Sequence, residues 1–353
     1  VMAYCDVLDP MAEAIGSVNT LVRRADGKLY GYNTDAAGFC FMAQRAGIGF
    51  AGRKTLVLGS GGASRTAAAC AKKLGAREVV VISRSGENNY TNLGRHADAE
   101  RIVNTTPVGM YPNNGAAAVD LTAFPACAGV LDLIYNPRRT ALLLQAETLG
   151  IPCSDGLPML VAQAKAAEEH FFDRLIADSE NERILAQLRR EMTNLVLIGM
   201  PGSGKSAVGA ALAALTGREA IDIDARIAEK AGCSIPEIFA KGGEAAFRAL
   251  EREATAACGA LSGKLLLTGG GVVKTPENYA ALHQNGRIYQ LLRPLELLPI
   301  DGRPLSQGVD LAAMWAERAP LYERFRDAAI DNSGTVEQTA QAIWRDFCEN
   351  SGH

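Results

Sequence analysis

The strongest chemical signal in the sequence is a glycine-rich stretch at residues 199–206 that ends in a lysine and a serine. The apolar run at 195–198 predicts a buried strand, Gly199 and Gly204-Lys205-Ser206 follow it, and a helical pattern continues to Leu215. This is the spacing of a phosphate-binding loop in its strand–loop–helix context. Glycines let successive backbone N–H groups point into one concavity, and the following helix N-terminus adds partial positive charge. The alternative is a glycine-rich turn with a chance lysine.

The loop predicts a site for a nucleotide and its magnesium ion. The Lys205 ammonium can reach the β- and γ-phosphates, and the Ser206 hydroxyl is placed for Mg²⁺. The loop residues expected to contact ATP are Gly202, Ser203, Gly204, Lys205, Ser206 and Ala207.

Two carboxylates follow the loop. Residues 219–224 resemble a strand, in which Asp222 and Asp224 would project to the same side. One carboxylate can hold Mg²⁺ through water, and the other can accept a substrate hydroxyl and its proton. A helix N-cap with a second, surface aspartate is the alternative. The next buried strand, 264–268, ends in glycines where many phosphate-loop enzymes carry an aspartate, so the metal would fall to Ser206 and Asp222.

Further along, Arg248 and Glu251 share one face of a predicted helix, three residues apart. They could form a simple surface ion pair. Alternatively, Glu251 could orient a guanidinium that binds a carboxylate, whose geometry matches the arginine fork.

Composition excludes several classes of protein. The 353 residues are enough for two domains, and the formal net charge of −3 without a basic block makes nucleic acid an unlikely partner. Eight cysteines without a CxxC pair and only four histidines argue against a disulfide framework and a structural zinc site. Free thiols suit a reducing, cytoplasmic location, and no apolar run reaches the length of a membrane span.

The first half contains a second glycine-rich turn. A predicted strand at 54–58 leads into Gly59-Ser-Gly-Gly-Ala63, an alanine-rich helix to Leu74 and a strand at 78–82. This βαβ arrangement is typical of dinucleotide binding, although Ser64 stands where the third glycine would be. Arg84, between two serines after the second strand, favours the 2′-phosphate of NADP over the ribose of NAD, unless it is a solvated surface arginine.

Polar residues also follow other predicted strands. Residues 15–22 and 28–32 are expected to form a hairpin through Asp26-Gly27. The segment Asn33-Thr-Asp35 then precedes a helix at 36–46 and is placed to face a cleft, or to cap that helix. Residues 102–110 are expected to form a strand that ends in a polar turn, and a further strand is expected at 130–135. Helices are expected at 140–149 and, led into by residues 155–163, as far as Phe172.

Six of these motifs together resemble the shikimate dehydrogenases. They are Gly16-Ser-Val-Asn-Thr20, Tyr32-Asn-Thr-Asp35, Gly59-Ser-Gly-Gly-Ala63, Ser83-Arg-Ser85, Asn104-Thr-Thr-Pro-Val-Gly-Met110 and Gly156-Leu-Pro-Met-Leu-Val-Ala-Gln163. The resemblance implies reduction of 3-dehydroshikimate by NADPH, with Asp35 as one half of a catalytic Lys–Asp pair. It implies that substrate is held by Asn19, Asp35 and Gln163, with Tyr135 nearby. It implies a cofactor site lined by Gly59, Ser60, Gly61, Gly62, Ala63, Ser83, Arg84, Ser85 and Gly156.

The family also carries a substrate domain with the catalytic lysine before this point, and the sequence starts at Val1 after it. We therefore expect an N-terminally truncated dehydrogenase with little activity, because the oxyanion formed by hydride transfer needs a proton donor or a cation. Exposed apolar surface is expected on residues 1–40.

The second half resembles shikimate kinase over its whole length. Besides the phosphate loop, Asp222-Ile-Asp224, Phe247-Arg-x-x-Glu251, Gly269-Gly-Gly271, Gly302-Arg-Pro-Leu305 and Arg318-Ala-Pro-Leu-Tyr322 occur in order. The resemblance implies phosphorylation of the shikimate 3-hydroxyl by Mg·ATP, with Asp224 positioning that hydroxyl. It implies that shikimate is held by Asp224, Arg248, Gly270 and Arg318, and that Arg303 contacts the phosphates from a lid between Arg293 and Ser306.

The sequence thus predicts an α/β protein with two domains. Residues 1–177 form a Rossmann-like NADP-binding domain with a remnant of a substrate domain, and 178–192 form a linker helix. Residues 193–353 form a three-layer α/β/α phosphate-loop kinase with a parallel sheet. Two alternatives stay open: an NADP-binding or interaction module beside a working kinase, and a kinase for another small polyol. The oligomeric state is not predicted.

Overall fold

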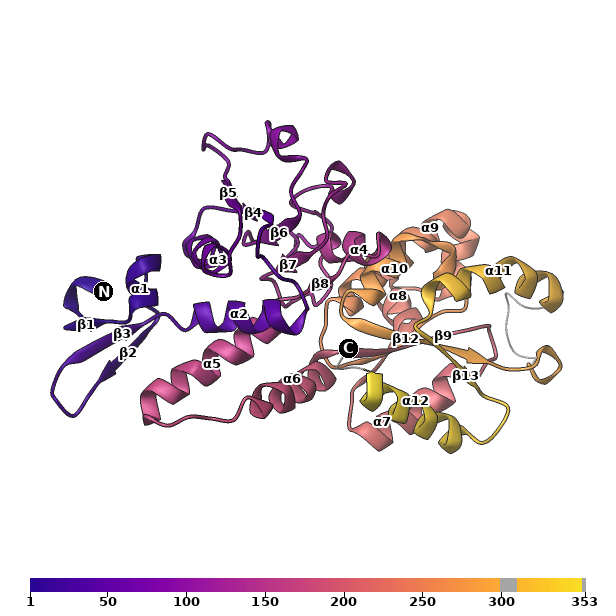
Figure 1. The fold of residues 1–353 in the computed structure, drawn as a ribbon. Coiled ribbons are helices and arrows are strands. Elements are labelled where there is room, and N and C mark those ends of the chain that lie inside the picture. Colours follow the sequence, from indigo (N-terminus) through magenta and orange to yellow (C-terminus); the bar gives the residue numbers. More distant parts are fainter. Residues whose placement is uncertain (299–309, 351–353) are drawn as a thin grey trace. The chain divides into compact units, whose positions relative to one another are not determined.

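The computed structural model describes residues 1–298 and 310–350 and divides the chain into two units, 1–185 and 186–353 (Figure 1). Helix α6 (Ser179–Met192) runs across the division. None of the helices in the described ranges combines the length and the apolar character needed to cross a bilayer.

The first unit contains two sheets. A small sheet has the order β1-β3-β2, with β1 parallel and β2 antiparallel to β3. A five-stranded parallel sheet has the order β5-β4-β6-β7-β8. The strands are β1 (Val7–Leu8), β2 (Thr20–Arg23), β3 (Leu29–Tyr32), β4 (Lys54–Leu58), β5 (Glu78–Ile82), β6 (Arg101–Asn104), β7 (Val130–Asp132) and β8 (Cys153–Ser154). The helices are α1 (Pro10–Ile15), α2 (Asp35–Arg45), α3 (Gly62–Lys73), α4 (Ala141–Thr148) and α5 (Leu157–Phe172), with 3-10 turns η1 (Met2–Tyr4), η2 (Leu93–His96) and η3 (Leu121–Ala123).

The second unit is built on one parallel sheet of order β10-β11-β9-β12-β13. Its strands are β9 (Asn194–Ile198), β10 (Ala220–Asp222), β11 (Leu265–Leu267), β12 (Gly286–Leu292) and β13 (Ala328–Asp331). Its helices are α7 (Lys205–Thr216), α8 (Ile223–Ala231), α9 (Ile235–Gly259), α10 (Glu277–His283), α11 (Leu311–Phe325) and α12 (Val336–Asn350), with 3-10 turns η4 (Val272–Lys274) and η5 (Leu295–Leu297).

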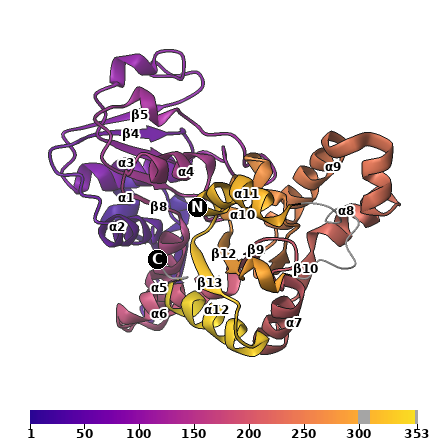
Figure 2. The ribbon, with the colours of Figure 1, turned by 90° about the vertical axis from the view of Figure 1, so that its right-hand side faces the viewer.

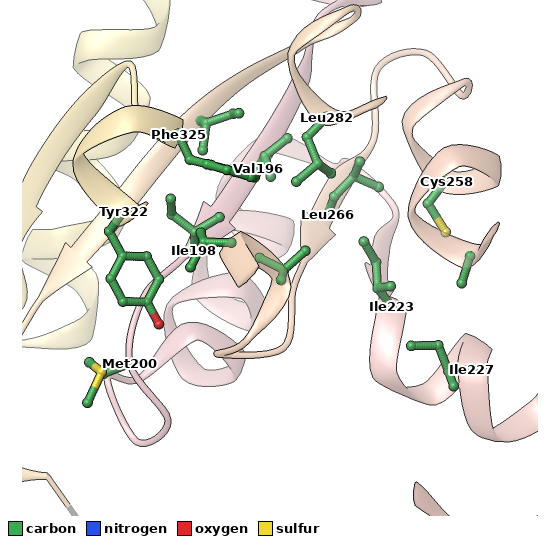
Figure 3. Packing of buried hydrophobic residues seen from close by; sticks show 14 of the residues in the cluster. Val196, Ile198, Met200, Ile223, Ile227, Cys258, Leu266, Leu282, Tyr322 and Phe325 are labelled. Atoms are coloured by element: carbon green, nitrogen blue, oxygen red, sulfur yellow. The ribbon is translucent and has the colours of Figure 1, made fainter. Parts of the chain in front are cut away.

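Alternate residues of β9 face opposite sides of this sheet, as the period of a strand requires. Val196 and Ile198 pack with residues of α8, α10 and α11, the cluster drawn in Figure 3. Leu195 and Leu197 pack with α7 and α12, which lie together on the other side of the sheet (Figures 1 and 2). The two covered faces make the predicted three layers, and both faces of β9 are fully buried.

The large sheet of the first unit is covered on both faces as well. Leu56 and Leu58 of β4 pack with α4, and Val57 packs with α2 and α3. The fold class expected from the sequence is confirmed in both units.

Two predicted strands are wrong at their boundaries. Residues 15–22 were expected to be a strand throughout, but α1 ends at Ile15 and Gly16 caps it with φ +70°. The strand of residues 219–224 ends at Asp222, where α8 begins. In both places, alternating apolar residues in a short run were compatible with either element.

Large apolar side chains are partly exposed in the first 40 residues. Val1, Tyr4 and Leu21 are 71%, 81% and 40% exposed, whereas Ile15 and Phe39 are buried.

Candidate functional site

The phosphate-binding loop lines a cavity of about 690 Å³ at the carboxyl ends of β9, β10 and β11. Parallel α/β sheets place ligand sites at this edge. The residues around the cavity that the sequence had singled out are Gly202, Gly204, Lys205, Ser206, Ala207, Asp222, Asp224, Arg248, Glu251, Gly270 and Arg318. Arg303 lies outside the described residues.

The loop takes the backbone shape expected from its glycines. Gly199, Gly202 and Gly204 have φ of +147°, +87° and +95°, which other residues rarely adopt. Lys205 Nζ folds back and donates to the carbonyl oxygens of Gly199 at 2.8 Å and Met200 at 3.1 Å. Ser203 is buried, and its hydroxyl has no hydrogen-bond partner in the described part of the chain. The two hydrogen bonds of Lys205 hold its ammonium group against the loop.

Asp222 and Asp224 both line the cavity, although not as neighbours on a strand. Asp222 is the N-cap of α8 and accepts hydrogen bonds from the backbone N–H groups of Asp224 and Ala225 at 2.9 and 3.2 Å. The capping alternative is therefore correct for Asp222. Asp224 lies in the first helical turn, against Gly269, where a Cβ would come within 2.7 Å of Asp224 Oδ1.

The Asp224 carboxyl has a raised pKa. Burial is the main cause and the charge of Asp222 adds to it, while Lys205 and Arg248 oppose the rise. Asp224 Oδ1 is buried without a hydrogen-bond partner among the described residues. A raised pKa and an unsatisfied oxygen suit a group that accepts a hydroxyl proton.

The buried carboxylate of Glu251 holds the guanidinium of Arg248 in place. Its Nη1 donates to Glu251 Oε2 at 2.7 Å and to the carbonyl oxygen of Gly271 at 3.1 Å. The Glu251 side chain is 1% exposed and that of Arg248 is 19% exposed. This excludes a simple surface ion pair, because the Glu251 carboxylate that holds the arginine is buried.

Arg318 approaches the cavity from α11. Its Nη1 donates to the Gly270 carbonyl oxygen at 3.1 Å, which also accepts from Tyr322 Oη at 2.5 Å. Arg318 lines the cavity, and its Nε is buried without a hydrogen-bond partner in the described ranges. Gly270 itself packs on the ring of Pro201, where a Cβ would come within 2.7 Å of Cδ.

The sequence analysis assigned no contact with the phosphate loop to two residues that lie beside it. Asn332, directly after β13, donates from Nδ2 to the Ser203 carbonyl oxygen at 2.6 Å and accepts from Thr339 Oγ1 at 2.8 Å. Arg293, at the end of β12, lines the cavity near Gly204. The polar turn of residues 331–334 was the available signal, but β13 had not been recognised before it.

In the first unit, three of the four predicted substrate residues come together. Asn19 Oδ1 accepts from the Thr34 N–H at 2.9 Å, and Thr34 Oγ1 donates to Gln163 Oε1 at 3.4 Å. Asp35 follows Thr34, and burial raises the pKa of its carboxyl while a hydrogen bond from Asn19 opposes the rise. Tyr135 is 42% exposed, and no described contact links it to this group.

A close helix crossing brings these residues together. Gly38 of α2 packs on α5, where a Cβ would come within 2.4 Å of the Met159 carbonyl oxygen. Only glycine permits this approach, which sets Asp35 at the start of α2 beside Gln163 on α5.

The second glycine-rich turn lies between β4 and α3. Gly59 has φ +111°, and its N–H donates to the Ile82 carbonyl oxygen at 2.8 Å, which brings the turn beside the end of β5. A Cβ on Gly61 or Gly62 would meet open space, so a ligand can approach the N-terminus of α3. Arg84 is exposed just after β5. Ser60 and Ala63 belong to the same turn and the start of α3, and Ser83 and Ser85 flank Arg84 after β5. Their contact with the cofactor stays a prediction.

Two residues of the cofactor motifs are fixed by packing. Ser64 replaces the usual glycine and is buried at 2% exposure inside α3. Gly156 packs against the backbone just after β7, where a Cβ would come within 2.1 Å of the Leu133 carbonyl oxygen.

Comparison with known proteins identifies both halves. Shikimate dehydrogenase (NADP(+)) of Clostridium perfringens is 37% identical over 202 residues, which cover 54% of this chain and 74% of that protein. The chain belongs to the shikimate dehydrogenase family. The corresponding protein of Geobacter sp. is 41% identical over 192 residues, covering 47% of this chain and 65% of that protein.

Two solved structures are each similar to one half of the chain. A chorismate mutase/shikimate 5-dehydrogenase fusion protein from Clostridium acetobutylicum has a TM-score of 0.50 and 33% identity, covering 53% of this chain and 72% of that chain. For the second half, residues 201–347 match the family model of shikimate kinase. Shikimate kinase from Acinetobacter baumannii, in complex with shikimate, is 32% identical with a TM-score of 0.42, covering 47% of this chain and 98% of that chain. The family-model match gives the chain a shikimate kinase domain at residues 201–347, after its shikimate dehydrogenase part, as both resemblances predicted.

Proposed function

We propose that the second unit transfers the γ-phosphoryl group of ATP to the 3-hydroxyl of shikimate. The observation that carries this proposal is a single cavity that brings Lys205 and Asp224 together with two guanidinium groups, those of Arg248 and Arg318. The kinase family match over residues 201–347 supports it.

Each residue has a role that its surroundings favour. Arg248 and Arg318 bind the substrate carboxylate, because both guanidinium groups line the cavity while their Nη1 atoms are fixed to Glu251 or to backbone. Asp224 orients the hydroxyl and takes its proton. Lys205 contacts the β- and γ-phosphates.

Magnesium fits the donor set at this place. The described residues contain no cluster of three or more histidine, cysteine or acidic side chains that could form an all-protein metal site. Mg²⁺ prefers oxygen ligands shared with phosphates, and the Ser206 hydroxyl and the Asp222 carboxylate both line the cavity. When bound, the ion would neutralise charge on the phosphates.

The test is ADP release by the full chain with a panel of acceptors. Shikimate should support turnover, whereas a cyclic polyol without a carboxylate should support little, because it cannot use the two arginines. Equal rates with both acceptors would contradict the substrate assignment.

For the first unit we propose NADP-dependent interconversion of shikimate and 3-dehydroshikimate. The cluster of Asn19, Asp35 and Gln163 and the open glycine turn before α3 support it. The NADP(+) dehydrogenases that the chain resembles support the cofactor. Shikimate-dependent formation of NADPH, read at its absorbance maximum, is the test.

One observation favours a second candidate, an NADP-binding module without turnover. Burial raises the pKa of the Asp35 carboxyl, and no lysine or arginine of the described residues opposes the rise, so no cation lies there for an oxyanion. Binding of NADPH without shikimate-dependent reduction of NADP⁺ would support the module.

A further inference from the structure

The fork of Arg248 that faces away from Glu251 is already engaged by a carboxylate of the chain itself. Arg248 Nε and Nη2 donate to Glu244 Oε1 at 3.2 and 3.0 Å. Together with the bonds from Nη1 to Glu251 and Gly271, this leaves one of the five N–H donors of the guanidinium without an acceptor among the described residues. A substrate carboxylate therefore cannot bind Arg248 through two N–H groups while Glu244 stays in place.

Glu244 has a second partner that can keep it when it leaves Arg248. Lys274 Nζ lies 3.1 Å from Glu244 Oε1 and 3.4 Å from Glu317 Oε1. The Glu244 side chain is 51% exposed, whereas that of Glu251 is 1% exposed. Of the two carboxylates on Arg248, only Glu244 can move into water at small cost, because exposed ion pairs contribute little.

The position of Glu244 in the chain also favours movement. It follows Gly243, whose φ of +68° and ψ of −171° break α9 into two helical segments. Glu244 therefore lies in the first turn of the second segment, one helical turn before Arg248.

We propose that Glu244 competes with the substrate carboxylate for the guanidinium of Arg248 and thereby sets the affinity of the kinase cavity for acidic substrates. The inference rests on the proposed function of the second unit. In the empty cavity Glu244 neutralises Arg248, and the arriving substrate displaces it toward Lys274. A neutral compound gains no charge-assisted bond from the exchange, so the competition favours carboxylates.

The test compares Glu244→Gln and Glu244→Ala with the native full chain in an assay of shikimate-dependent ADP release. Removing the competing charge should lower the KM for shikimate about two- to five-fold, the range that an exposed ion pair represents. The kcat and the KM for ATP should stay unchanged. Two variants are needed because a glutamine at 244 can still accept a hydrogen bond.

Glu317→Gln is the matched control. It removes the other acidic partner of Lys274 without touching Arg248, so any fall in the KM for shikimate should be smaller than in the Glu244 variants. A raised or unchanged KM in both Glu244 variants would overturn the proposal, since Glu244 would then only orient Arg248. An equal fall in Glu317→Gln would overturn it as well. Failure of the native chain to release ADP with shikimate would be distinct, because it would remove the proposed function itself.

Discussion

Asp224 is the residue on which the chemistry of the second unit depends most. Its carboxyl has a raised pKa, one oxygen is unsatisfied, and it lies against the backbone of Gly269. We expect Asp224→Asn to lower kcat for shikimate phosphorylation about 10²-fold or more, because the amide cannot accept a proton. Binding of ATP, measured by titration calorimetry, should persist.

Glu229→Gln is the control for that variant. Glu229 lies on the same helix, α8, and pairs with Arg226 outside the cavity. Its kcat should equal the native value. A native-like kcat for Asp224→Asn would show that Asp224 neither takes the proton nor orients the hydroxyl.

Asp132 gives the first unit a predictable response to pH. Its carboxylate is fully buried and accepts hydrogen bonds from Thr140, Asn104 and Ile134, yet burial raises its pKa to about 6. The native state then binds this proton more tightly than the unfolded state. The unfolding free energy should therefore fall as pH rises from about 4 through 6.

Asp132→Asn should remove this part of the pH dependence. The expected difference between pH 5 and pH 7 is about 1 kcal/mol in the native chain, relative to the variant. Urea unfolding followed by far-ultraviolet circular dichroism measures it. Asp120→Asn is the control. Hydrogen bonds from Thr122 lower the pKa of the exposed Asp120 carboxyl, so this substitution should not alter the pH dependence of the unfolding free energy above pH 5. A parallel response in native and Asp132→Asn protein would contradict the prediction.

At the scale of elements, β13 supports the phosphate loop through Asn332. This side chain ties the Ser203 carbonyl oxygen, 129 residues away, to Thr339 of α12. Asn332→Ala should raise the KM for ATP severalfold and destabilise the second unit by about 1–3 kcal/mol, because a buried carbonyl loses its donor. The KM for shikimate should change little.

Ser333→Ala provides a neighbouring comparison. Ser333 is exposed and bonds only within its own turn, to Asp331. The kinetic constants and the thermal unfolding temperature of Ser333→Ala should be close to the native values. If Asn332→Ala behaves in the same way, the loop does not depend on β13.

The sequence predicted the elements whose chemistry is local. The phosphate loop, the Asp26-Gly27 hairpin and the strand at 54–58 each carry a complete signal within a few residues, and each is present. The strand of residues 219–224 failed because Ile221 and Ile223 alternate as in a strand, while the capping bonds of Asp222 start a helix. Local hydrogen bonds decided what the apolar pattern could not.

The same reasoning explains which site residues were found. Lys205, Asp224 and Arg248 lie in recognisable motifs, whereas Asn332 and Glu244 act through contacts that depend on side-chain geometry. Such contacts between distant segments, or between a motif residue and its neighbour, have no fixed spacing in the sequence.

At the scale of the whole molecule, each unit has its own core and its own candidate ligands. Both tryptophans, Trp315 and Trp344, belong to the second unit. We expect two unfolding transitions, of which tryptophan fluorescence reports only one. ATP with shikimate should raise that transition, and NADPH should raise the other, because each ligand stabilises the native unit that binds it.

Thermal unfolding followed by fluorescence and by far-ultraviolet circular dichroism checks whether there are two transitions and which ligand raises each. A single transition that both ligand sets raise equally would contradict separate binding units.

The most direct measurement of the central claim is the shikimate KM of Arg248→Ala, taken with the ATP KM in the same assay of ADP release. The account predicts a rise in the shikimate KM of about tenfold or more, since a charge-assisted carboxylate bond contributes about 1.5–3 kcal/mol. The ATP KM should remain nearly native. An unchanged shikimate KM would show that this cavity does not recognise its substrate through the Arg248 guanidinium.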